Sequence, residues 1–481
     1  MTDFTVYVDG RWSAGDGAEY ASVDPSRGAT FTTWRLASVA QADAAVAAAG
    51  AAFGSWSRTG PGERAAVLRR FADLLEKNHE ELAQLVVTEV GSPISLARTL
   101  QTATPVANLR WAADVAESGP RGGYRERLVP LEGPARVESE LLRVPIGVVA
   151  AMTPYNYPVN MIAWKVGPAL AAGCTVVLLP SPRGSRCSVE VVRLAEEAGV
   201  PPGILNLVPG GPDVGQRLAA HPDVDLVSFT GSNAVGAAVA EAAAPLHTKV
   251  VLELGGKSPT VVLPGADLDK AVGPSMLRFC RNAGQGCGAT TRILVHRSQY
   301  DDFVAASIAF LHDEVPVGDP RDEATEIGPL ISAEHRERVE GYLRRAVDGG
   351  ARILVGGGRP DGPGYYLEPT LVADVGAGDE ICQEELFAPV ATVMPYDTVD
   401  EAVELANDSR YGLNALVWGE PTEARDVALR LETGTVAING GGGARPDVPW
   451  TGFKRSGVGS EMGLDGFGEF FRVRHLQWPE E

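Results

Sequence analysis

One cysteine lies among residues with almost no side-chain bulk. Cys287 stands near the end of the stretch 279–288, which reads FCRNAGQGCG. Upstream, Glu253 is a lone carboxylate at the end of an apolar run and directly precedes the segment LGGKSP. An accessible thiol suits nucleophilic attack on a carbonyl, and an isolated carboxylate suits activation of a water molecule. Taken alone, Cys287 could equally be a packed core thiol, because free cysteine is among the most buried residue types.

A second candidate lies on a predicted loop between a strand and a helix. The motif TPYNYP at residues 153–158 follows the predicted strand 146–152, and Pro158 suits the first turn of a helix. Ligands of α/β proteins bind at the carboxyl ends of parallel strands. Asn156 is therefore expected at a ligand-binding edge of the sheet, where its side-chain amide is a possible hydrogen-bond donor. A loop asparagine that only satisfies a turn is the alternative.

A third motif places glycine between a β-rich run and a helix. Residues 228–236 read SFTGSNAVG, and Ser232 is the expected N-cap of a helix over 234–244. The N-terminus of a helix presents free N–H groups and a positive dipole to an anion. The glycine spacing differs from the usual dinucleotide fingerprint. For this motif alone, a tight turn between strand and helix is the alternative.

The elements that must position these residues alternate between strands and helices. From residue 144 to 262, short β-rich runs are separated by helical patterns, and from 264 to about 450 the alternation repeats with different spacing. This pattern predicts two α/β domains with parallel strands and crossover helices. Residues 40–117 are predicted to be helical, and short alternating runs within 1–35 predict a hairpin arm. The strand 136–143 has few core-forming positions, which predicts an edge strand that pairs with another subunit.

Composition narrows the classes of function. A chain of 481 residues predicts two or three domains. The net charge of −20 argues against nucleic acid and anionic membranes as partners. The start shows no secretory signal, and the longest apolar run is too short to span a bilayer. Five scattered cysteines without a Cys-x-x-Cys pair suggest reduced thiols in a cytoplasm and argue against a zinc site.

Together these motifs resemble the aldehyde dehydrogenase superfamily, over essentially the full chain and in the usual order. The C-terminal run PWTGFKRSG at 449–457 and Asn439 before it match the same resemblance. It implies an α/β fold with two parallel-sheet domains and a small β oligomerisation arm. The implied parts are a dinucleotide-binding domain (1–120 and 144–252), the arm (121–143 and 470–481) and a catalytic domain (253–469). It also implies a homodimer or homotetramer.

The resemblance implies a reaction and its catalytic residues. The reaction is oxidation of an aldehyde to a carboxylic acid with hydride transfer to NAD or NADP. Cys287 would be the nucleophile that forms a thiohemiacetal and then a thioester, and Glu253 the base that activates water. Asn156 would stabilise the oxyanion, and Lys165 would line the site and assist a proton relay. The presence of Glu253 favours hydrolysis over transfer to coenzyme A.

The resemblance also implies two sets of binding residues. The cofactor would lie against Thr153, Pro154, Tyr155, Ser181, Gly231, Ser232, Gly236, Leu254, Gly255, Glu385 and Phe387. The substrate pocket would comprise Tyr157, Met161, Trp164, Gly286, Ala444, Arg445 and Trp450. Apolar and aromatic side chains in this pocket, with a small-sided loop at 439–448, favour a bulky, apolar or aromatic aldehyde. Arg445 could instead bind the carboxylate of a semialdehyde.

One departure affects the cofactor. Family members usually carry a lysine and a glutamate that reach the adenosine ribose, and Leu179 and Pro182 stand at those positions here. Three hypotheses follow. NAD binds weakly, or an arginine (Arg183 or Arg186) favours the 2′-phosphate of NADP, or the scaffold works without redox as a cysteine acyl transferase or thioesterase. We favour them in that order, ahead of an inactive binding or structural role.

Overall fold

The computed structural model describes residues 5–131, 136–442 and 445–479. Its larger sheet has eight strands in the order β2-β1-β9-β8-β7-β10-β11-β22. The five strands from β9 to β11 are parallel, as the alternating pattern predicts. They are β7 (Val148–Thr153), β8 (Thr175–Pro180), β9 (Leu205–Leu207), β10 (Leu226–Thr230) and β11 (Lys249–Glu253).

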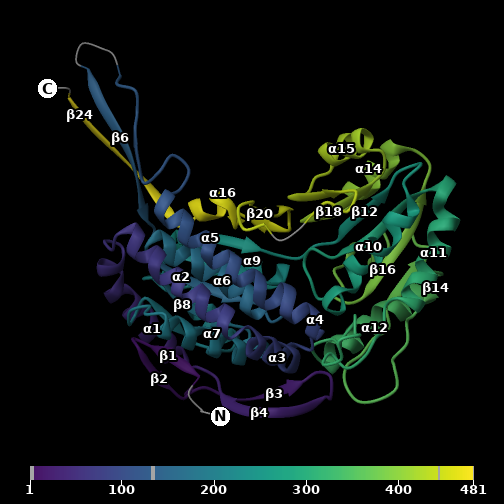
Figure 1. Cartoon of the computed structure of the whole chain (residues 1–481), viewed down its shortest axis with the longest axis horizontal. Coiled ribbons are helices and arrows are strands. Elements are labelled where there is room, and N and C mark those ends of the chain that lie inside the picture. Colours follow the sequence, from purple (N-terminus) through teal and green to yellow (C-terminus); the bar gives the residue numbers. More distant parts are fainter. Residues whose placement is uncertain (1–4, 132–135, 443–444, 480–481) are drawn as a thin grey trace.

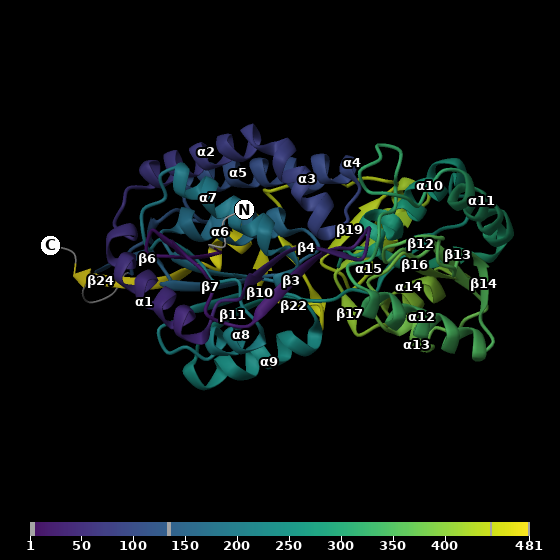
Figure 2. The same cartoon turned by 90° about the horizontal axis from the view of Figure 1, so that it is seen from below.

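Helices cover both faces of this sheet (Figure 2). Alternate residues of β7 explain why: Val149 and Ala151 pack into one hydrophobic core, and Val148 and Ala150 into another. One layer contains α6 (Pro158–Ala172), α7 (Ser185–Glu197), α2 (Pro61–Lys77), α3 (His79–Val90) and α5 (Thr104–Ser118). The other contains α1 (Val39–Trp56), α8 (Pro212–Ala219) and α9 (Asn233–Ala243).

The order of the strands creates a crevice at one edge of the sheet. After β7 the chain builds β8 and β9 on one side, and it then returns to place β10 and β11 on the other side. The connections therefore diverge between β7 and β10. In open α/β sheets, ligands bind at such a switch point, outside the carboxyl ends of the strands. Thr153 ends β7 and Thr230 ends β10, so the motifs that follow both strands meet here.

The second sheet has seven strands in the order β14-β15-β16-β13-β12-β18-β19. All neighbouring pairs are parallel except β14 with β15. The strands are β12 (Ser258–Val262), β13 (Thr290–His296), β14 (Arg352–Val355), β15 (Thr370–Ala373), β16 (Val390–Tyr396), β18 (Asn414–Trp418) and β19 (Thr435–Ile438). Its helices include α10 (Leu268–Cys280), α11 (Tyr300–Asp313), α12 (Ala333–Asp348), α14 (Val399–Asn407) and α15 (Pro421–Arg430).

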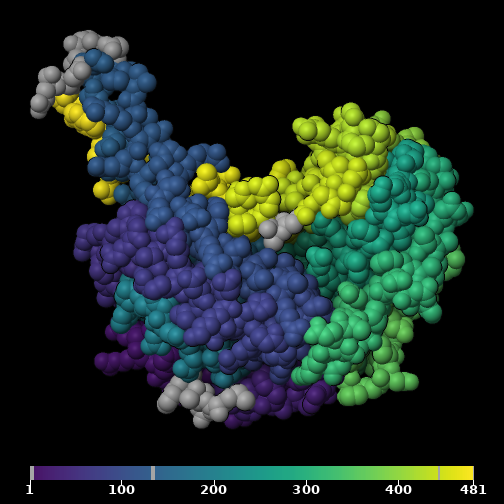
Figure 3. All heavy atoms as spheres, in the orientation of Figure 1, coloured from purple at the N-terminus to yellow at the C-terminus, as the bar shows by residue number. Residues whose placement is uncertain are grey.

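The prediction of an edge strand at 136–143 is wrong. The short strand β22 (Gly457–Val458), which falls within the predicted catalytic range 253–469, pairs with β11 of the first sheet. The strand β6 (Val137–Pro145) is not an edge strand, because it lies between β5 (Arg125–Arg127) and β24 (Phe471–Pro479). These three strands project from the body of the molecule (Figures 1 and 3), and β24 and β5 form the edges.

The N-terminal segment forms two hairpins rather than one arm. The first comprises β1 (Val6–Val8) and β2 (Arg11–Ser13) and extends the larger sheet through the pairing of β1 with β9. The second comprises β3 (Glu19–Asp24) and β4 (Ala29–Arg35).

In the predicted helical region, a π-helix (η1, Ala97–Ala103) follows the short helix α4 (Ile94–Leu96) and precedes α5. None of the helices in the described residues is both long and apolar enough to cross a bilayer.

Candidate active site

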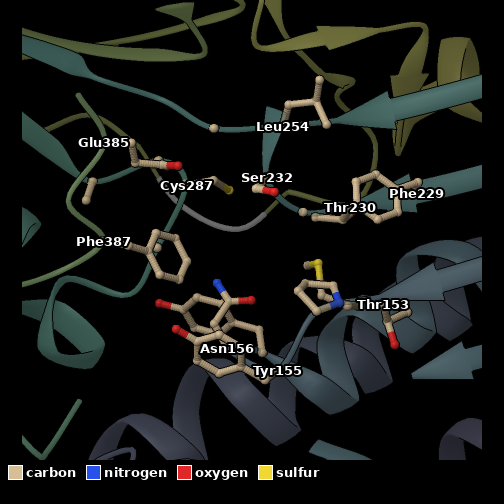
Figure 4. A pocket seen from close by; sticks show the side chains of 18 of the residues that line it. Thr153, Tyr155, Asn156, Phe229, Thr230, Ser232, Leu254, Cys287, Glu385 and Phe387 are labelled. Atoms are coloured by element: carbon tan, nitrogen blue, oxygen red, sulfur yellow. The ribbon is translucent and has the colours of Figure 1, made fainter. Parts of the chain in front are cut away.

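A cavity of about 1910 Å³ lies where the crevice of the first sheet faces the second domain. Its walls include residues that follow β7 and β10, the segment after α10, and the loops around 385 and 440. Figure 4 shows Cys287 between Glu385 and Phe387 on one side and Thr230 on the other. Asn156 lies across the cavity from Cys287. The structure therefore brings the sequence motifs into one space.

The segment before Cys287 reverses direction sharply. Asn282, Ala283 and Gly284 have positive φ angles of 55°, 54° and 71°, in the left-handed region that L-residues rarely adopt. At Gly284 a Cβ atom would lie 2.1 Å from the carbonyl of Ala388, so only glycine fits. This turn ends α10 and directs Cys287 into the cavity before β13 begins.

Buried hydrogen bonds hold this turn against the loop of Asn156. The side chain of Asn156 donates from Nδ2 to the carbonyl of Gln285 at 2.9 Å. The carbonyl of Asn156 accepts from Asn282 Nδ2 at 3.1 Å and from Gln101 Nε2 at 2.9 Å. Gln101 comes from the π-helix η1 and also donates to Ser92. Sequence reasoning missed Gln101, Ser92 and Asn282, since a polar residue in a helical pattern gives no sign that it is buried.

The surroundings of Cys287 oppose ionisation of its thiol. Burial raises its pKa to about 12, and the nearby carboxylates of Glu385 and Glu253 contribute to the rise. Cys287 is partly exposed, whereas the other four cysteines are buried, and all five are free thiols. The most exposed of the five cysteines is thus the one that sequence analysis selected.

Glu253 lies behind the cavity wall rather than on it. Its side chain is 2% exposed, and neither carboxylate oxygen has a hydrogen-bond partner among the described residues. Burial raises its pKa well above the ordinary value, and the charge of Glu461 adds to the rise, while Lys165 opposes it. A buried carboxyl group whose pKa is raised in this way suits a role as a general acid or base.

Lys165 also lies outside the lining of the cavity, contrary to the prediction that it lines the site. It is fully buried and forms an ion pair with Glu461. Its Nζ also donates to Ser228 Oγ at 3.0 Å, and Ser228 Oγ lies 3.1 Å from Glu461 Oε1. Sequence analysis missed Glu461 and Ser228. Glu461 ends the two-residue strand β23 (Ser460–Glu461), and the sequence around Gly459 and Ser460 reads as a surface turn.

The half of the cavity next to the first sheet fits a dinucleotide. The hydroxyl groups of Thr153 and Thr230 are buried at the ends of their strands and have no hydrogen-bond partner among the described residues. Ser232 caps α9 by accepting from Val235 N at 3.4 Å, and Asn233 and Ala234 of the first turn of α9 line the cavity, where free N–H groups of a helix N-terminus suit an anion. Gly231, Ser232, Leu254 and Gly255 all line the cavity.

Gly236 does not line the cavity. A Cβ atom at this position would lie 2.4 Å from Leu254 Cδ2, so the glycine lets α9 pack against Leu254. The other predicted cofactor residues that line the cavity are Pro154, Tyr155, Ser181, Glu385 and Phe387.

Glu385 and Phe387 close the other end of the dinucleotide half. Glu385 Oε1 accepts from Gly256 N at 3.0 Å, and burial raises the pKa of Glu385 to about 7. Phe387 has a φ angle of 58° and meets the ring of Tyr155 edge to face at 6.2 Å. A non-glycine residue in this conformation is uncommon, and such backbone strain is concentrated at functional sites.

The two residues that stand in place of the family's usual ribose-binding side chains lie on the cavity wall. Leu179 and Pro182 both line it, next to Arg183. The side chain of Arg183 is 43% exposed and lies 3.8 Å from Glu334, a weak pairing that leaves the guanidinium available. Arg186 is buried and does not line the cavity, and its N–H donates to Glu89 at 2.8 Å. Of the two arginines considered in the sequence, only Arg183 is therefore placed to meet a cofactor.

The substrate half of the cavity is lined by aromatic and apolar side chains. The rings of Trp164 and Trp450 lie 6.1 Å apart. The predicted residues found on this wall are Tyr157, Met161, Trp164, Gly286, Arg445 and Trp450. Arg445 already forms a two-pronged ion pair with Asp447, at 3.0 and 2.6 Å. Ala444 lies outside the described residues.

A nucleophilic thiol, an amide donor and a dinucleotide-shaped crevice in one cavity define a class of cysteine-dependent dehydrogenase. Comparison with known proteins agrees: the sequence profile of the "Aldehyde dehydrogenase family" matches residues 12–476. The chain is 41% identical to a 3-succinoylsemialdehyde-pyridine dehydrogenase of a Pseudomonas species, over 98% of both chains. It is 42% identical to a geranial dehydrogenase of Castellaniella defragrans, over 90% of both.

Solved structures of related proteins match the fold of this protein over almost the whole chain. Aldehyde dehydrogenase C of Pseudomonas syringae, a mutant crystallised with NAD+ and octanal, is 41% identical with a TM-score of 0.93 and covers 99% of this chain and 96% of its own. A betaine aldehyde dehydrogenase mutant of Staphylococcus aureus with NAD+ is 35% identical with a TM-score of 0.95 and the same coverage.

The chain belongs to the aldehyde dehydrogenase family. It is an NAD(P)-dependent enzyme that oxidises an aldehyde to a carboxylic acid, and the predicted α/β fold of this family is confirmed. The comparisons give no support to the non-redox alternative of an acyl transferase or thioesterase.

Proposed function

We propose that this enzyme works through a covalent intermediate on Cys287, with Asn156 and Glu253 in distinct roles. The observation that carries this proposal is the meeting of Cys287 and Asn156 in one cavity with the crevice between β7 and β10. The sulfur of Cys287 bonds to the aldehyde carbon, and the thiol proton passes to a base. The carbonyl oxygen then becomes an alkoxide.

Asn156 and the backbone N–H of Cys287 hold this alkoxide. One hydrogen of Asn156 Nδ2 is engaged by the carbonyl of Gln285, which leaves the second hydrogen for the substrate. The bond to Gln285 fixes the direction of the amide before substrate arrives. Oxyanion donors oriented in this way accelerate comparable reactions about 10²–10³-fold.

The residues of the crevice fit NAD or NADP. The unpartnered hydroxyls of Thr153 and Thr230 and the first turn of α9 would hold the cofactor, with Glu385 and Phe387 at its nicotinamide end. When bound, the cofactor would supply the acceptor for the hydride that leaves the substrate carbon. Cys287 then carries a thioester.

Glu253 completes the cycle by activating the water that hydrolyses this thioester. Since its carboxylate lies behind the wall, its side chain must rotate toward Cys287 to reach the water. The raised pKa of Glu253 makes it a stronger base than an exposed glutamate once it is ionised. Lys165 and Glu461 lie next to it and offer an exit for the proton.

Two variants test this scheme. Cys287→Ala should abolish oxidation while cofactor binding persists. Glu253→Gln should still release about one equivalent of reduced cofactor per site and then slow by about 10²–10⁴-fold, because only the water step needs the base. Rapid acid quench and mass measurement should find the acyl group on Cys287. Oxidation by Cys287→Ala at the wild-type rate, or no burst in Glu253→Gln, contradicts the assigned roles.

We also propose that NAD is preferred and that it binds with modest affinity. Leu179 and Pro182 offer the adenosine ribose no side-chain donor or acceptor, whereas Arg183 could contact a 2′-phosphate. Calorimetric titration of NAD and NADP into wild-type enzyme and Arg183→Gln tests this. Tighter binding of NADP that is lost in the variant would reverse the preference.

The substrate and the assembly complete the proposal. Met161, Trp164 and Trp450 on the wall suit an aldehyde with a bulky apolar or aromatic body. The named relatives act on such diverse aldehydes as geranial and betaine aldehyde. The long free edge of β24 suits pairing with a second copy in a homodimer or homotetramer. Five free thiols suit the reducing environment of a cytoplasm.

A further inference from the structure

One amide on the substrate wall of the cavity has its oxygen engaged and its nitrogen free. Asn160 lies in the first turn of α6, between Tyr157 and Trp164 in the sequence, and lines the same cavity as Cys287. Its side chain is 6% exposed, and Oδ1 accepts from Nδ2 of Asn108 on α5 at 3.0 Å. Nδ2 of Asn160 has no hydrogen-bond partner among the described residues. This nitrogen is not one of the sealed polar atoms that lack a partner, so it is open to the cavity.

An amide is unusual on this helix. Apart from Asn160, the only side chain of α6 with an amide or a charge is Lys165, which is fully buried and paired with Glu461. The other residues of α6 that line the cavity are Met161 and Trp164. Ligand sites commonly combine apolar walls with a few polar groups that fix orientation. Asn160 is such a group within an otherwise apolar part of the wall.

The position of Asn160 places this nitrogen beside the body of a bound aldehyde. Tyr157 lies close to the nucleophile, because its Oη would be 3.6 Å from a Cβ atom on Gly286, the residue before Cys287. Asn160 follows Tyr157 by three residues and precedes Trp164 by four, about one helical turn from each. The side chain therefore stands between the reacting end of the substrate half and its aromatic wall.

A free donor at this place affects which aldehydes bind well. An amide N–H that is open to the cavity is hydrated before the substrate binds. A wholly apolar substrate body would displace that water and leave the donor unpaired, which costs binding free energy. A substrate oxygen at the same place would replace the lost hydrogen bond. Sites built around such a donor discriminate against analogues that lack the acceptor.

We propose that Asn160 is a specificity-determining residue that donates from Nδ2 to a second oxygen in the body of the substrate, separate from the aldehyde oxygen. The inference rests on the proposed function, in which the aldehyde carbon reaches Cys287. The substrate class is thus an aldehyde whose apolar or aromatic body also carries a ketone or amide carbonyl. A carbonyl oxygen suits a neutral amide donor, because it accepts hydrogen bonds and carries no charge.

Two alternatives make different predictions. If Asn160 only joins α6 to α5, its oxygen alone matters: Asn108 donates to it, and Thr104 Oγ1 lies 3.4 Å away. Loss of that role would lower stability and slow the oxidation of every aldehyde alike. The second alternative is the hydroxyl of Tyr157, which also lacks a hydrogen-bond partner among the described residues. Nε1 of Trp164 is sealed in the wall, so it does not compete.

The test compares keto aldehydes, with the ketone at successive positions along the chain, with alkanals of equal length. In wild-type enzyme the ratio of kcat/KM for keto aldehyde to kcat/KM for alkanal should peak at one ketone position. In Asn160→Leu, which replaces the amide by an apolar group of similar size, this peak ratio should fall about 3- to 10-fold, as expected for one hydrogen bond, mostly through KM for the keto aldehyde. Met161→Leu, at the next wall residue, is the matched control and should leave the ratio unchanged.

The series on unmodified enzyme is a second readout, in case a variant fails to fold. Because the bond to Asn108 fixes the amide, the preference should depend on the position of the ketone. A ratio that does not vary with that position would overturn the assignment. So would a ratio that is unchanged in Asn160→Leu, or one that is lost in Tyr157→Phe instead. Absence of reduced cofactor from all of the aldehydes would instead refute the proposed function.

Discussion

Burial and two nearby carboxylates together oppose ionisation of the Cys287 thiol. Burial raises its pKa to about 12, and the carboxylates of Glu385 and then Glu253 add to the rise. Glu385 itself titrates near pH 7, since it too is buried. The reactivity of the thiol should therefore depend on the charge of Glu385, and not only on pH. Such coupling between two groups is open to measurement in the enzyme without cofactor.

Glu385→Gln should accelerate alkylation of Cys287 by iodoacetamide. Only the thiolate reacts, and below the pKa its fraction increases with pH. Removal of the negative charge lowers the pKa of Cys287, so at pH 8–9 the variant should react about three- to tenfold faster, as expected for a shift of about half a unit to one unit. Below about pH 6 Glu385 is protonated in the wild type, and the two rates should converge. A ratio that stays constant with pH would refute this coupling. Cys287→Ala provides the blank.

At the scale of elements, local sequence patterns predicted most of the fold. The strand Thr175–Pro180 is entirely buried and rich in valine and leucine, and α6 begins at Pro158 as expected. The pairing of Gly457–Val458 with β11 was not predicted, because its partner lies some two hundred residues away and two residues carry no periodicity. The position of β6 between two strands was missed for the same reason: a strand pattern does not indicate its neighbours.

The same limit explains which site residues were missed. Cys287, Glu253 and Asn156 stand in motifs that differ from their surroundings, so the sequence singled them out. Glu461 and Gln101 are buried in contact with residues that are distant in the sequence, Lys165 and Asn156. Only the folded structure shows these contacts. Gly286 and Gly284 look alike in the sequence, but the structure has space for a side-chain carbon at Gly286 and none at Gly284.

These two glycines provide a matched pair of variants. In Gly284→Ala the methyl group would lie 2.1 Å from the carbonyl of Ala388 at a φ angle of 71°, so the turn before Cys287 must shift. We expect a loss of stability of about 1–3 kcal/mol and a fall in kcat. In Gly286→Ala the nearest atom is Tyr157 Oη at 3.6 Å, an ordinary contact. Thermal unfolding should therefore separate the variants, and equal midpoints would contradict the strained geometry of the turn.

At the scale of the whole molecule, residues from the domains of both large sheets form the active site. The arm, which consists of β5, β6 and β24, is a separate three-stranded sheet. Cys287 and Glu385 come from the second domain, and Asn156 and Thr230 from the first. The arm contributes no residue to the cavity wall among those the structure describes. It nevertheless presents apolar side chains to solvent, including Val473 at 62% and Trp478 at 38% exposure. A long strand edge with exposed apolar residues invites pairing with another chain, which supports the proposal that the arm serves assembly.

The double variant Val473→Lys with Leu476→Lys should therefore reduce the size of the assembly. Lysine on β24 opposes pairing of its free edge with the same edge of a second subunit, because like charges would meet there and apolar contact would be lost. Light scattering coupled to size exclusion should show a mass at least halved relative to the wild type. Leu429→Lys, at a leucine that is 78% exposed on α15, tests whether any added lysine has this effect. An unchanged mass in the arm variant, with β24 still folded against β6, would place the subunit contact elsewhere. Because the arm lies outside the cavity, a dissociated enzyme should keep the local geometry around Cys287, and its alkylation rate should follow that of the intact assembly.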